Sequence, residues 1–222
     1  MNLSLFDLDG TLLPKDSDHA FGEYLIGQGW ADAEQFKQRN DAFYADYLAG
    51  KLDMDAYVDF ASAPWRDRST SEQSAVLQGF VDAVVRPMLL PAVTELVRSH
   101  QQAGDLVAIV TATNDFVTRP IARLLGVEHL LATDLARDAQ GRVLGTVQGQ
   151  ACFREGKIGR VNDWLAAQGL KLQDFERSTF YSDSTNDLPL LERVSHPVAT
   201  NPSPALERIA LQRGWPVLKL FT

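Results

Sequence analysis

Cysteine and histidine are scarce in this sequence of 222 residues, which has one cysteine and four histidines. The single thiol, Cys152, excludes an intramolecular disulfide and a cysteine-rich metal site, and its apolar neighbours predict ordinary burial. No two histidines are closely spaced, so the ligand pattern of a zinc site is missing. We expect His100, His129 and His196 to be structural, and any metal site to use oxygen ligands.

Long hydrophobic runs are absent as well. No apolar stretch approaches the roughly 20 residues that a membrane-spanning helix needs. The segment Met1–Asp7 lacks the basic start and the extended apolar stretch of a signal peptide. We therefore expect a cytoplasmic protein without a membrane partner.

Positive charge is in deficit, because 21 lysines and arginines face 29 aspartates and glutamates, for a formal net charge of −8. Binding to a phosphate backbone depends on clustered basic residues, so nucleic acid is not an expected partner. The deficit is concentrated, since residues 14–82 contain thirteen acidic and six basic residues. One third of the chain thus carries nearly all of the net charge. No feature predicts an oligomeric state.

The hydrophobic pattern changes along the chain. Within residues 14–84, apolar side chains repeat at helical spacing, with Asp53 as a possible N-cap and Thr70–Gln73 resembling a capping box. Farther along, short apolar runs alternate with helical patterns. This alternation predicts an α/β fold with a doubly wound, mostly parallel, Rossmann-like sheet. We expect a core of residues 1–13 and 85–222, and a small all-helical cap of residues 14–84 inserted after the first strand.

Three predicted strands end in polar residues. The run Leu3–Phe6 stops at Asp7, the run Leu106–Val110 stops at Thr111, and an apolar segment leads directly into Asp183. Ligands of open parallel sheets collect beyond the carboxyl ends of the strands. The sequence therefore predicts one ligand site built by the loops that follow these strands, with the helical insert folded over it.

Asp7 and Asp9 lie two residues apart, so if the strand geometry continues both carboxylates point the same way. Such a pair suits a shared cation, or a division of labour between an ionised nucleophile and a protonated general acid. Gly10 permits a sharp turn after the pair, and Thr11 offers a hydroxyl that can fix the loop. The alternative is that the Asp-Gly-Thr segment is only a turn.

Asp183 and Asp187 form a second acidic pair at a predicted strand-to-helix junction. Carboxylates from separate loops are the ligands that Mg²⁺ prefers, although both residues could instead cap a helix. Thr111 precedes a predicted helix, where its hydroxyl and nearby amides can bind phosphate or simply cap the helix. Lys157 lies at the start of another helix, where a cation is unfavourable without a nearby anion; the alternative is a solvated surface lysine.

In chain order, these segments resemble the four motifs of the haloacid dehalogenase-like phosphatases, namely Asp7–Thr11, Thr111, Lys157 and Ser182–Asp187. The helical insert is similar to the small cap of the phosphoserine-phosphatase-like branch, and the turn around Gly141 matches a β-hairpin found there before the lysine motif. The resemblance covers nearly the whole chain. The segment 111–116 looks closest to a bacterial subgroup, some members of which are called histidinol-phosphatases.

The resemblance implies a Mg²⁺-dependent phosphate-monoester hydrolase. Asp7 would attack phosphorus to form an aspartyl-phosphate, and Asp9 would protonate the leaving alcohol and then deprotonate water. The Asp7 carboxylate, the Asp9 carbonyl and Asp183 would hold Mg²⁺, with Asp187 close by. The groups implied to stabilise the phosphoryl oxygens are Thr111 and Lys157, and those implied to bind phosphate or substrate are Gly10, Thr11, Ala112, Thr113, Asn186 and Asp16.

The cap departs from the pattern of phosphoserine phosphatase. The glutamate that meets the substrate ammonium there falls on Asp16, whereas the arginine that holds the substrate carboxylate falls on Ala61. An acidic cap without that arginine favours a small cationic phosphate ester such as histidinol phosphate. The alternatives are that Arg66 or Arg68 replaces the arginine, or that cap acidity serves only solubility. Of the cap's other residues, His19 has a weak case for a substrate contact.

The aromatic residues of the insert carry no functional prediction. Eleven of the twenty Phe, Tyr and Trp residues lie in 14–84, and we expect them to form the cap's own core.

Other functions share parts of this pattern. A phosphoserine phosphatase or a phosphotransferase of the same superfamily would use the same aspartyl-phosphate, with an alcohol in place of water in the second case. A receiver-like phospho-acceptor module also combines a strand-end aspartate with Mg²⁺, but Asp9 and the helical insert speak against it.

Overall fold

The structure is a computed structural model that describes residues 1–221, and its core is a six-stranded sheet with the order β3-β2-β1-β6-β7-β8. All neighbouring strands of this sheet pair in parallel, whereas β4 and β5 form a separate antiparallel hairpin. The strands are β1 (Leu3–Phe6), β2 (Leu106–Asn114), β3 (His129–Thr133), β4 (Leu135–Arg137), β5 (Val143–Val147), β6 (Ser178–Ser182), β7 (His196–Thr200) and β8 (Val217–Leu218). The predicted α/β fold with a parallel sheet is confirmed.

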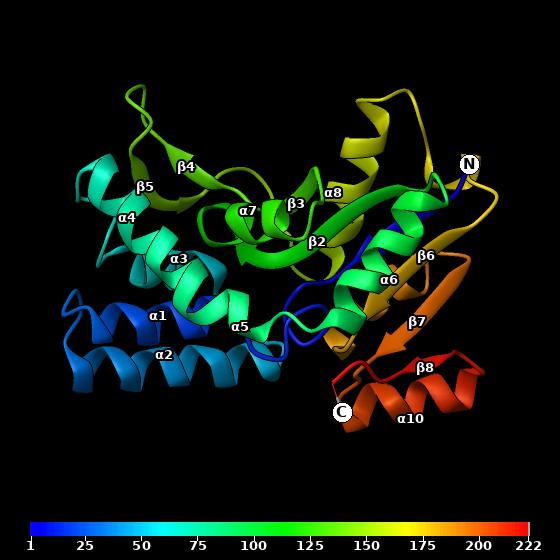
Figure 1. The fold of residues 1–222 in the computed structure, drawn as a ribbon, viewed down its shortest axis with the longest axis horizontal. Helices are drawn as coiled ribbons and strands as arrows, with labels where there is room; N and C mark the ends of the chain where they lie inside the picture. The colour runs from blue at the N-terminus through cyan, green and yellow to red at the C-terminus, as the bar shows by residue number, and fades with distance from the viewer. Residues whose placement is uncertain (222) are drawn as a thin grey trace.

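The helices divide between the insert and the core. The insert contains α1 (Ser17–Gly27), α2 (Ala33–Leu48), α3 (Met54–Ser62) and α4 (Thr70–Phe80), followed by the π-helix Val81–Val85 and the short α5 (Arg86–Met88). The core contains α6 (Pro91–Gln102), α7 (Asp115–Leu124), α8 (Glu155–Ala166), α9 (Leu188–Leu191) and α10 (Pro204–Arg213), with short 3-10 turns at Leu172–Asp174 and Thr185–Asp187. Figure 1 shows α1–α4 grouped at the edge of the sheet toward which the strand arrows point.

Helices of the core cover both faces of the sheet, and successive side chains of a strand point alternately toward one face and the other. Phe6 joins a hydrophobic cluster with side chains of α6 and α7, whereas Leu3 and Leu5 join a second cluster with side chains of α8, α9 and α10. Strand β2 divides in the same way, because Ile109 belongs to the first cluster and Val110 to the second. Both faces are covered, which explains why these strands read as continuous apolar runs.

Strand β1 occupies the point where the strand order reverses. It pairs with β2 on one side and with β6 on the other, and Phe6 is level with both Ile109 and Tyr181. The segments that follow these three residues therefore lie together at the carboxyl-terminal end of the strands. This is the topological switch point at which open α/β sheets bind ligands.

The insert and the core share a hydrophobic cluster. Phe21, Val58 and Phe80 of the insert belong to the same cluster as Phe6 of β1. The Trp65 ring stacks on the ring of Phe116 in α7, with centroids 3.9 Å apart. The limits 1–13, 14–84 and 85–222 stay predictions, because the helical path continues through the π-helix into α5 without a break.

Three details of the predicted secondary structure were wrong. The capping box of α4 is formed by Ser69 and Glu72, one residue earlier than predicted, because α4 begins at Thr70. Strand β2 runs to Asn114 and not only to Val110, since polar residues at its end still pair with β3. Strand β3 was missed, because its five residues give too short an apolar run to stand out.

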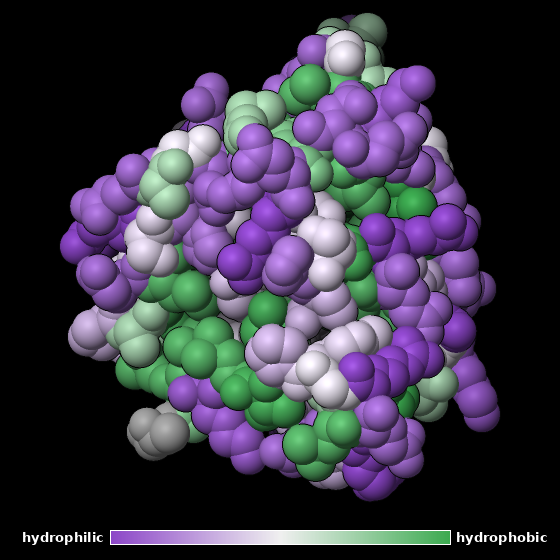
Figure 2. All heavy atoms as spheres, turned by 90° about the vertical axis from the view of Figure 1, so that its right-hand side faces the viewer, coloured by the Kyte–Doolittle hydropathy of each residue, from purple (hydrophilic) through white to green (hydrophobic). Residues whose placement is uncertain are grey.

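The outer surface of the core has both hydrophilic and hydrophobic side chains. Figure 2 shows the side that faces right in Figure 1, at the opposite end from the insert, where hydrophilic side chains cover most of the face and hydrophobic ones gather toward the lower left. Within residues 1–221, no single helix is long and apolar enough to span a membrane, although one bent pair, Thr70–Met88 with Pro91–Gln102, passes by length and composition.

A polar network lies between α6 and the sheet. The Nδ1 atom of His100 lies 2.7 Å from the Asp105 carboxylate and 2.9 Å from the Ser4 hydroxyl, and its Nε2 atom lies 2.8 Å from the Tyr181 hydroxyl. Burial raises the pKa of Asp105, but hydrogen bonds from His100, Ser4 and Asn2 outweigh it and hold the pKa below its usual value. The structural role predicted for His100 agrees with this network.

Replacement of His100 by alanine is expected to lower the free energy of unfolding by about 1–3 kcal/mol, because two hydroxyls and a carboxylate lose a partner. The lowered pKa of Asp105 stabilises the fold above the ordinary aspartate pKa of 3.8, and this contribution is lost as the pH falls through the folded-state value. The free energy of unfolding of His100→Ala, measured with urea, should therefore differ less from that of the native protein at pH 3 than at pH 7. His196→Ala, at an exposed position, is the control; an equal loss there would contradict the assignment.

Candidate active site

Lys157 joins two of the predicted acidic residues. Its ammonium nitrogen lies 2.8 Å from Asp7 Oδ1 and 2.7 Å from Asp187 Oδ2, and the residue is only 1% exposed. It stands in the first turn of α8, so the carboxylates supply the anions that this position requires. Burial alone would lower the pKa of Lys157, but Asp187 and Asp7 raise it, so the side chain is charged. The surface-lysine alternative was wrong.

Asp7 and Asp183 approach each other across the switch point. The Thr11 hydroxyl lies 3.5 Å from Asp7 Oδ2 and 3.4 Å from Asp183 Oδ1, so one buried hydroxyl spans the two carboxylates. Gly10 has a φ of 76°, and a Cβ atom there would overlap the Asp183 carboxylate. The glycine is therefore required both by the turn and by the approach of Asp183 to the backbone.

Asp9 is held from the insert and from the core at once. Its Oδ1 accepts a hydrogen bond from the Ser17 amide at 2.8 Å, at the start of α1. Its Oδ2 accepts one from the Thr113 hydroxyl at 2.8 Å, at the end of β2. Asp9 therefore points away from the Lys157 pair, so the two aspartates of the first loop have different surroundings.

Burial dominates the electrostatics of the acidic cluster. It raises the pKa of Asp7 to about 7, with Lys157 opposing the shift and Asp187 adding to it. It raises the pKa of Asp9 to about 7, to which the charge of Asp16 contributes. Burial, followed by repulsion from Asp7 and Asp187, raises the pKa of Asp183 well above its usual value. Lys157 alone therefore does not balance these carboxylates when all of them are ionised.

This excess of charge bears on metal binding. Within residues 1–221, no three His, Cys, Asp or Glu side chains are arranged to hold a metal by themselves. The predicted set requires only the carboxylates of Asp7 and Asp183 together with the Asp9 carbonyl, and Asp183 forms no ion pair in the described part of the chain. Oxygen donors with uncompensated charge suit a hard divalent cation, so the donor set fits Mg²⁺. Asp187 instead faces Lys157 and the Ser182 hydroxyl.

The end of β2 contributes the segment Thr111–Thr113. Thr111 is 1% exposed, and its hydroxyl accepts a hydrogen bond from the Thr113 amide at 3.2 Å. The alternative that Thr111 caps the helix was wrong, because β2 continues to Asn114, which is the N-cap of α7. Ala112 and Thr113 line a pocket between the core and the insert.

Asn186 contacts the insert. Its amide donates to the carbonyl oxygen of Tyr47 at 2.9 Å, and Arg154 donates to the carbonyl of Gly50 at 3.0 Å. Both contacts hold the end of α2 against the loops that carry the acidic cluster.

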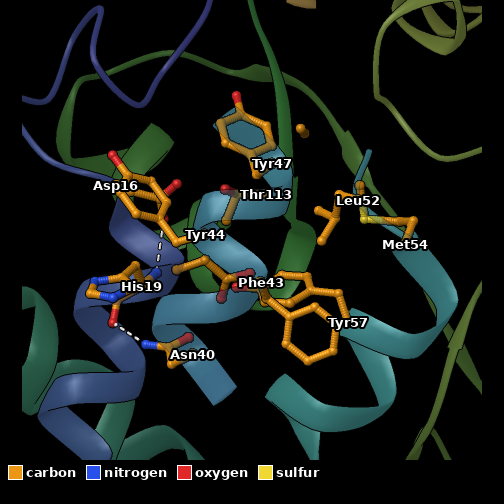
Figure 3. A pocket seen from close by; sticks show the side chains of 12 residues that line it. Asp16, His19, Asn40, Phe43, Tyr44, Tyr47, Leu52, Met54, Tyr57 and Thr113 are labelled. Atoms are coloured by element: carbon orange, nitrogen blue, oxygen red, sulfur yellow. Dashed lines mark hydrogen bonds between the residues drawn. The ribbon is translucent and has the colours of Figure 1, made fainter. Parts of the chain in front are cut away.

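The pocket beneath the insert is lined by acidic and aromatic side chains (Figure 3). Tyr44 lies close to His19, with ring centroids 5.1 Å apart, while Phe43 and Tyr57 meet edge to face at 5.4 Å. The residues that line it are Asp16, Asp18, His19, Asn40, Phe43, Tyr44, Tyr47, Leu52, Met54, Tyr57, Ala112 and Thr113. An adjoining hollow is lined by Asp9, Gly10, Pro14, Lys15, Asp16, Tyr44, Tyr47, Leu48, Asp183 and Ser184. Four aromatic residues therefore line this pocket, contrary to the expectation that they serve only the cap's own core.

Neither arginine considered as a replacement lines these cavities. Arg66 pairs with Asp59, and Arg68 lies 3.9 Å above the Trp30 ring and bonds to Glu72. Among the described residues, the aromatic pocket has no lysine or arginine in its lining.

Sequence reasoning missed Asp18, Asn114 and Tyr57. Asn114 donates to both oxygens of the Asp18 carboxylate at 3.1 Å, and Tyr57 lines the same pocket as Asp18. These three residues come from β2, α1 and α3, so only the folded chain brings them together. Cys152 is buried as predicted, and burial raises its pKa to about 12.

The chain is similar to known proteins over nearly its whole length. A histidinol-phosphatase from Neisseria meningitidis serogroup C (strain 8013) is 44% identical over 217 residues, which cover 98% of each chain. A solved protein of unknown function from Bordetella pertussis Tohama I is 48% identical, with a TM-score of 0.93 and 99% coverage of both chains. A substrate-bound phosphoserine phosphatase complex shares the fold at 16% identity, with a TM-score of 0.68 and coverage of 97% of this chain and 91% of that one.

The family assignment rests on the sequence as well as on the fold. The model of the haloacid dehalogenase-like hydrolase family matches residues 5–192, which include all four motif segments. The chain therefore belongs to the haloacid dehalogenase-like hydrolases and is a phosphatase of that family.

Proposed function

We propose that this protein is a Mg²⁺-dependent hydrolase of a small cationic phosphate monoester, with histidinol phosphate as the best candidate. The observation that carries the proposal is the buried cluster at the switch point, in which Asp7, Asp183 and Lys157 meet beneath a pocket whose described lining has no lysine or arginine. Histidinol phosphate has an amine and an imidazole and no carboxylate. The 44%-identical relative named histidinol-phosphatase supports the same substrate.

Asp7 is the proposed nucleophile. Its Oδ1 is held by Lys157, so Oδ2 is the oxygen that bonds to phosphorus as the ester P–O bond breaks. This forms an aspartyl-phosphate and divides one difficult displacement into two easier ones. Lys157 keeps Asp7 oriented and offers positive charge to the phosphoryl oxygens. Thr111, Gly10 and Thr11 are the other groups proposed to bind the phosphoryl group.

Asp9 is the proposed general acid and base. As the ester bond breaks, Asp9 would give a proton to the leaving alcohol oxygen. It would then take a proton from the water that attacks the aspartyl-phosphate and releases inorganic phosphate. The hydrogen bonds from Ser17 and Thr113 fix the carboxyl on the insert side of the site, where the leaving group lies.

The carboxylates of Asp7 and Asp183 and the carbonyl of Asp9 are the proposed ligands of Mg²⁺. A bound Mg²⁺ supplies charge neutralisation between an anionic nucleophile and an anionic phosphate. Asp187 supports the cluster through Lys157.

Phosphoserine is the runner-up substrate. A phosphoserine phosphatase, SerB1, from Mycobacterium tuberculosis (strain ATCC 25618 / H37Rv) is 30% identical over 225 residues, which cover 96% of this chain and 69% of that protein. Against this substrate, the described residues that line the aromatic pocket include no lysine or arginine for its carboxylate, and the Nε2 atom of His19 faces Asp41. Lys15, in the adjoining hollow, is the nearest alternative.

Asp7→Asn is expected to remove the Mg²⁺-dependent release of phosphate from a generic aryl phosphate, because an amide cannot form the aspartyl-phosphate. In the native protein, EDTA should abolish the activity and added Mg²⁺ should restore it. Asp32→Asn is the matched control, since Asp32 is an exposed N-cap of α2 and asparagine caps equally well. Undiminished turnover in Asp7→Asn would remove Asp7 from its role.

Asp9→Asn is expected to affect poor leaving groups most. For an alkyl phosphate, loss of the general acid should lower kcat/KM by roughly 10²- to 10⁴-fold. For an aryl phosphate the loss should be clearly smaller, because a phenolate leaves without a proton and kcat/KM reports the first chemical step. Steady-state kinetics on both ester types test this, and equal losses would contradict the assignment.

The substrate prediction is tested by the kcat/KM values of the native protein. We expect histidinol phosphate to exceed phosphoethanolamine, and phosphoethanolamine to exceed phosphoserine, since only phosphoserine brings a carboxylate into an acidic pocket. A preference for phosphoserine would overturn the choice of substrate while leaving the hydrolase intact.

A further inference from the structure

The two cavities beneath the insert adjoin each other. Asp16, Tyr44 and Tyr47 line both of them, whereas Asp183 lines only the hollow over the phosphate loops and Asp18 lines only the aromatic pocket. Asp16 therefore lies where the two cavities meet, whereas Asp18 belongs to the aromatic pocket alone. The two carboxylates lie at different positions along one substrate.

Asp18 is held in place by the core. Asn114 accepts a hydrogen bond from the Val117 amide through Oδ1 at 3.1 Å, which caps α7 and fixes the orientation of the amide. Its Nδ2 group is thereby turned toward Asp18, and it lies 3.1 Å from each carboxylate oxygen. Tyr57 of α3 lines the same pocket. The position of Asp18 does not depend on a ligand.

The charge of Asp18 has no partner of opposite sign among the described residues. The residue is 6% exposed and forms no ion pair within residues 1–221, and the partners named above are neutral. If Asp18 only linked the insert to the core, an amide side chain would be sufficient, because a buried carboxylate without a cation is costly. A buried, preoriented carboxylate at the wall of an aromatic pocket is instead suited to accept an N–H group of a ligand.

We infer that Asp18, positioned by Asn114, is a specificity residue that accepts a hydrogen bond from a ring N–H at the far end of the leaving group. The inference rests on the proposed function and deepens it. Asp16 would meet the amine beside the ester, and Asp18 the imidazole beyond it. Phe43, Leu52 and Met54 supply apolar walls for the flat ring.

Three phosphate esters distinguish the role of Asp16 from that of Asp18. Histidinol phosphate has both the amine and the imidazole, phosphoethanolamine has only the amine, and 3-(imidazol-4-yl)propyl phosphate has only the ring. Asp18→Asn is expected to lower kcat/KM by roughly 10- to 100-fold for the two imidazole esters, and by less than about 3-fold for phosphoethanolamine. Asp16→Asn should instead lower it for the two amine esters.

Two controls distinguish a contact from other effects. Asp32→Asn makes the same change of charge elsewhere on the insert, and it should leave all three kcat/KM values unchanged. The thermal midpoint of Asp18→Asn should stay the same or rise, because a buried charge is removed while an amide can keep the contact with Asn114. A merely structural Asp18 would instead lower the midpoint and reduce all three activities equally.

The outcomes also separate this inference from the proposed function. Equal losses on all three esters, or no loss on the imidazole esters, would overturn the role of Asp18 while Mg²⁺-dependent hydrolysis persists. Persistence of full activity in Asp7→Asn would overturn the hydrolase mechanism itself, whatever Asp18 does.

Discussion

The site depends on one buried cation. Lys157 is almost completely enclosed, and it bridges Asp7 after β1 and Asp187 after β6 from the first turn of α8. Three chain segments that are distant in sequence are thus tied to one ammonium group. Without it, the carboxylates would repel one another in a poorly solvated site, and without them a buried lysine would be prohibitively costly. This mutual dependence fixes the geometry on which phosphoryl chemistry relies.

A second constraint links the chemistry to the insert. Asp9 receives one hydrogen bond from α1 and one from the end of β2, so its carboxyl is fully positioned only while the insert packs on the core. Asn186 and Arg154 hold the end of α2 in the same way, and the Trp65–Phe116 stack ties the opposite part of the insert to α7. The elements that enclose the pocket therefore also orient the proposed general acid.

Local patterns in the sequence were sufficient to predict the fold class and the site loops. The apolar runs before Asp7 and Asp183, and the change of period after the insert, correspond to β1, β6 and the α/β core. Errors arose where the local signal was weak. Strand β3 is short, and polar residues at the end of β2 concealed its continuation to Asn114, so the strand was predicted to end at Thr111. The burial of Lys157 was also beyond local reasoning.

The sequence by itself determined which chemical groups are available, because residue type and spacing fix the paired aspartates after the first strand and the absence of cysteine ligands. Only the tertiary structure decided which groups meet. Asp18, Asn114 and Tyr57 converge from three elements, the aromatic rings of the insert line a pocket as well as a core, and Arg66 and Arg68 are used elsewhere. The physical reason is that packing between distant segments sets these contacts, and it leaves no periodic trace along the chain.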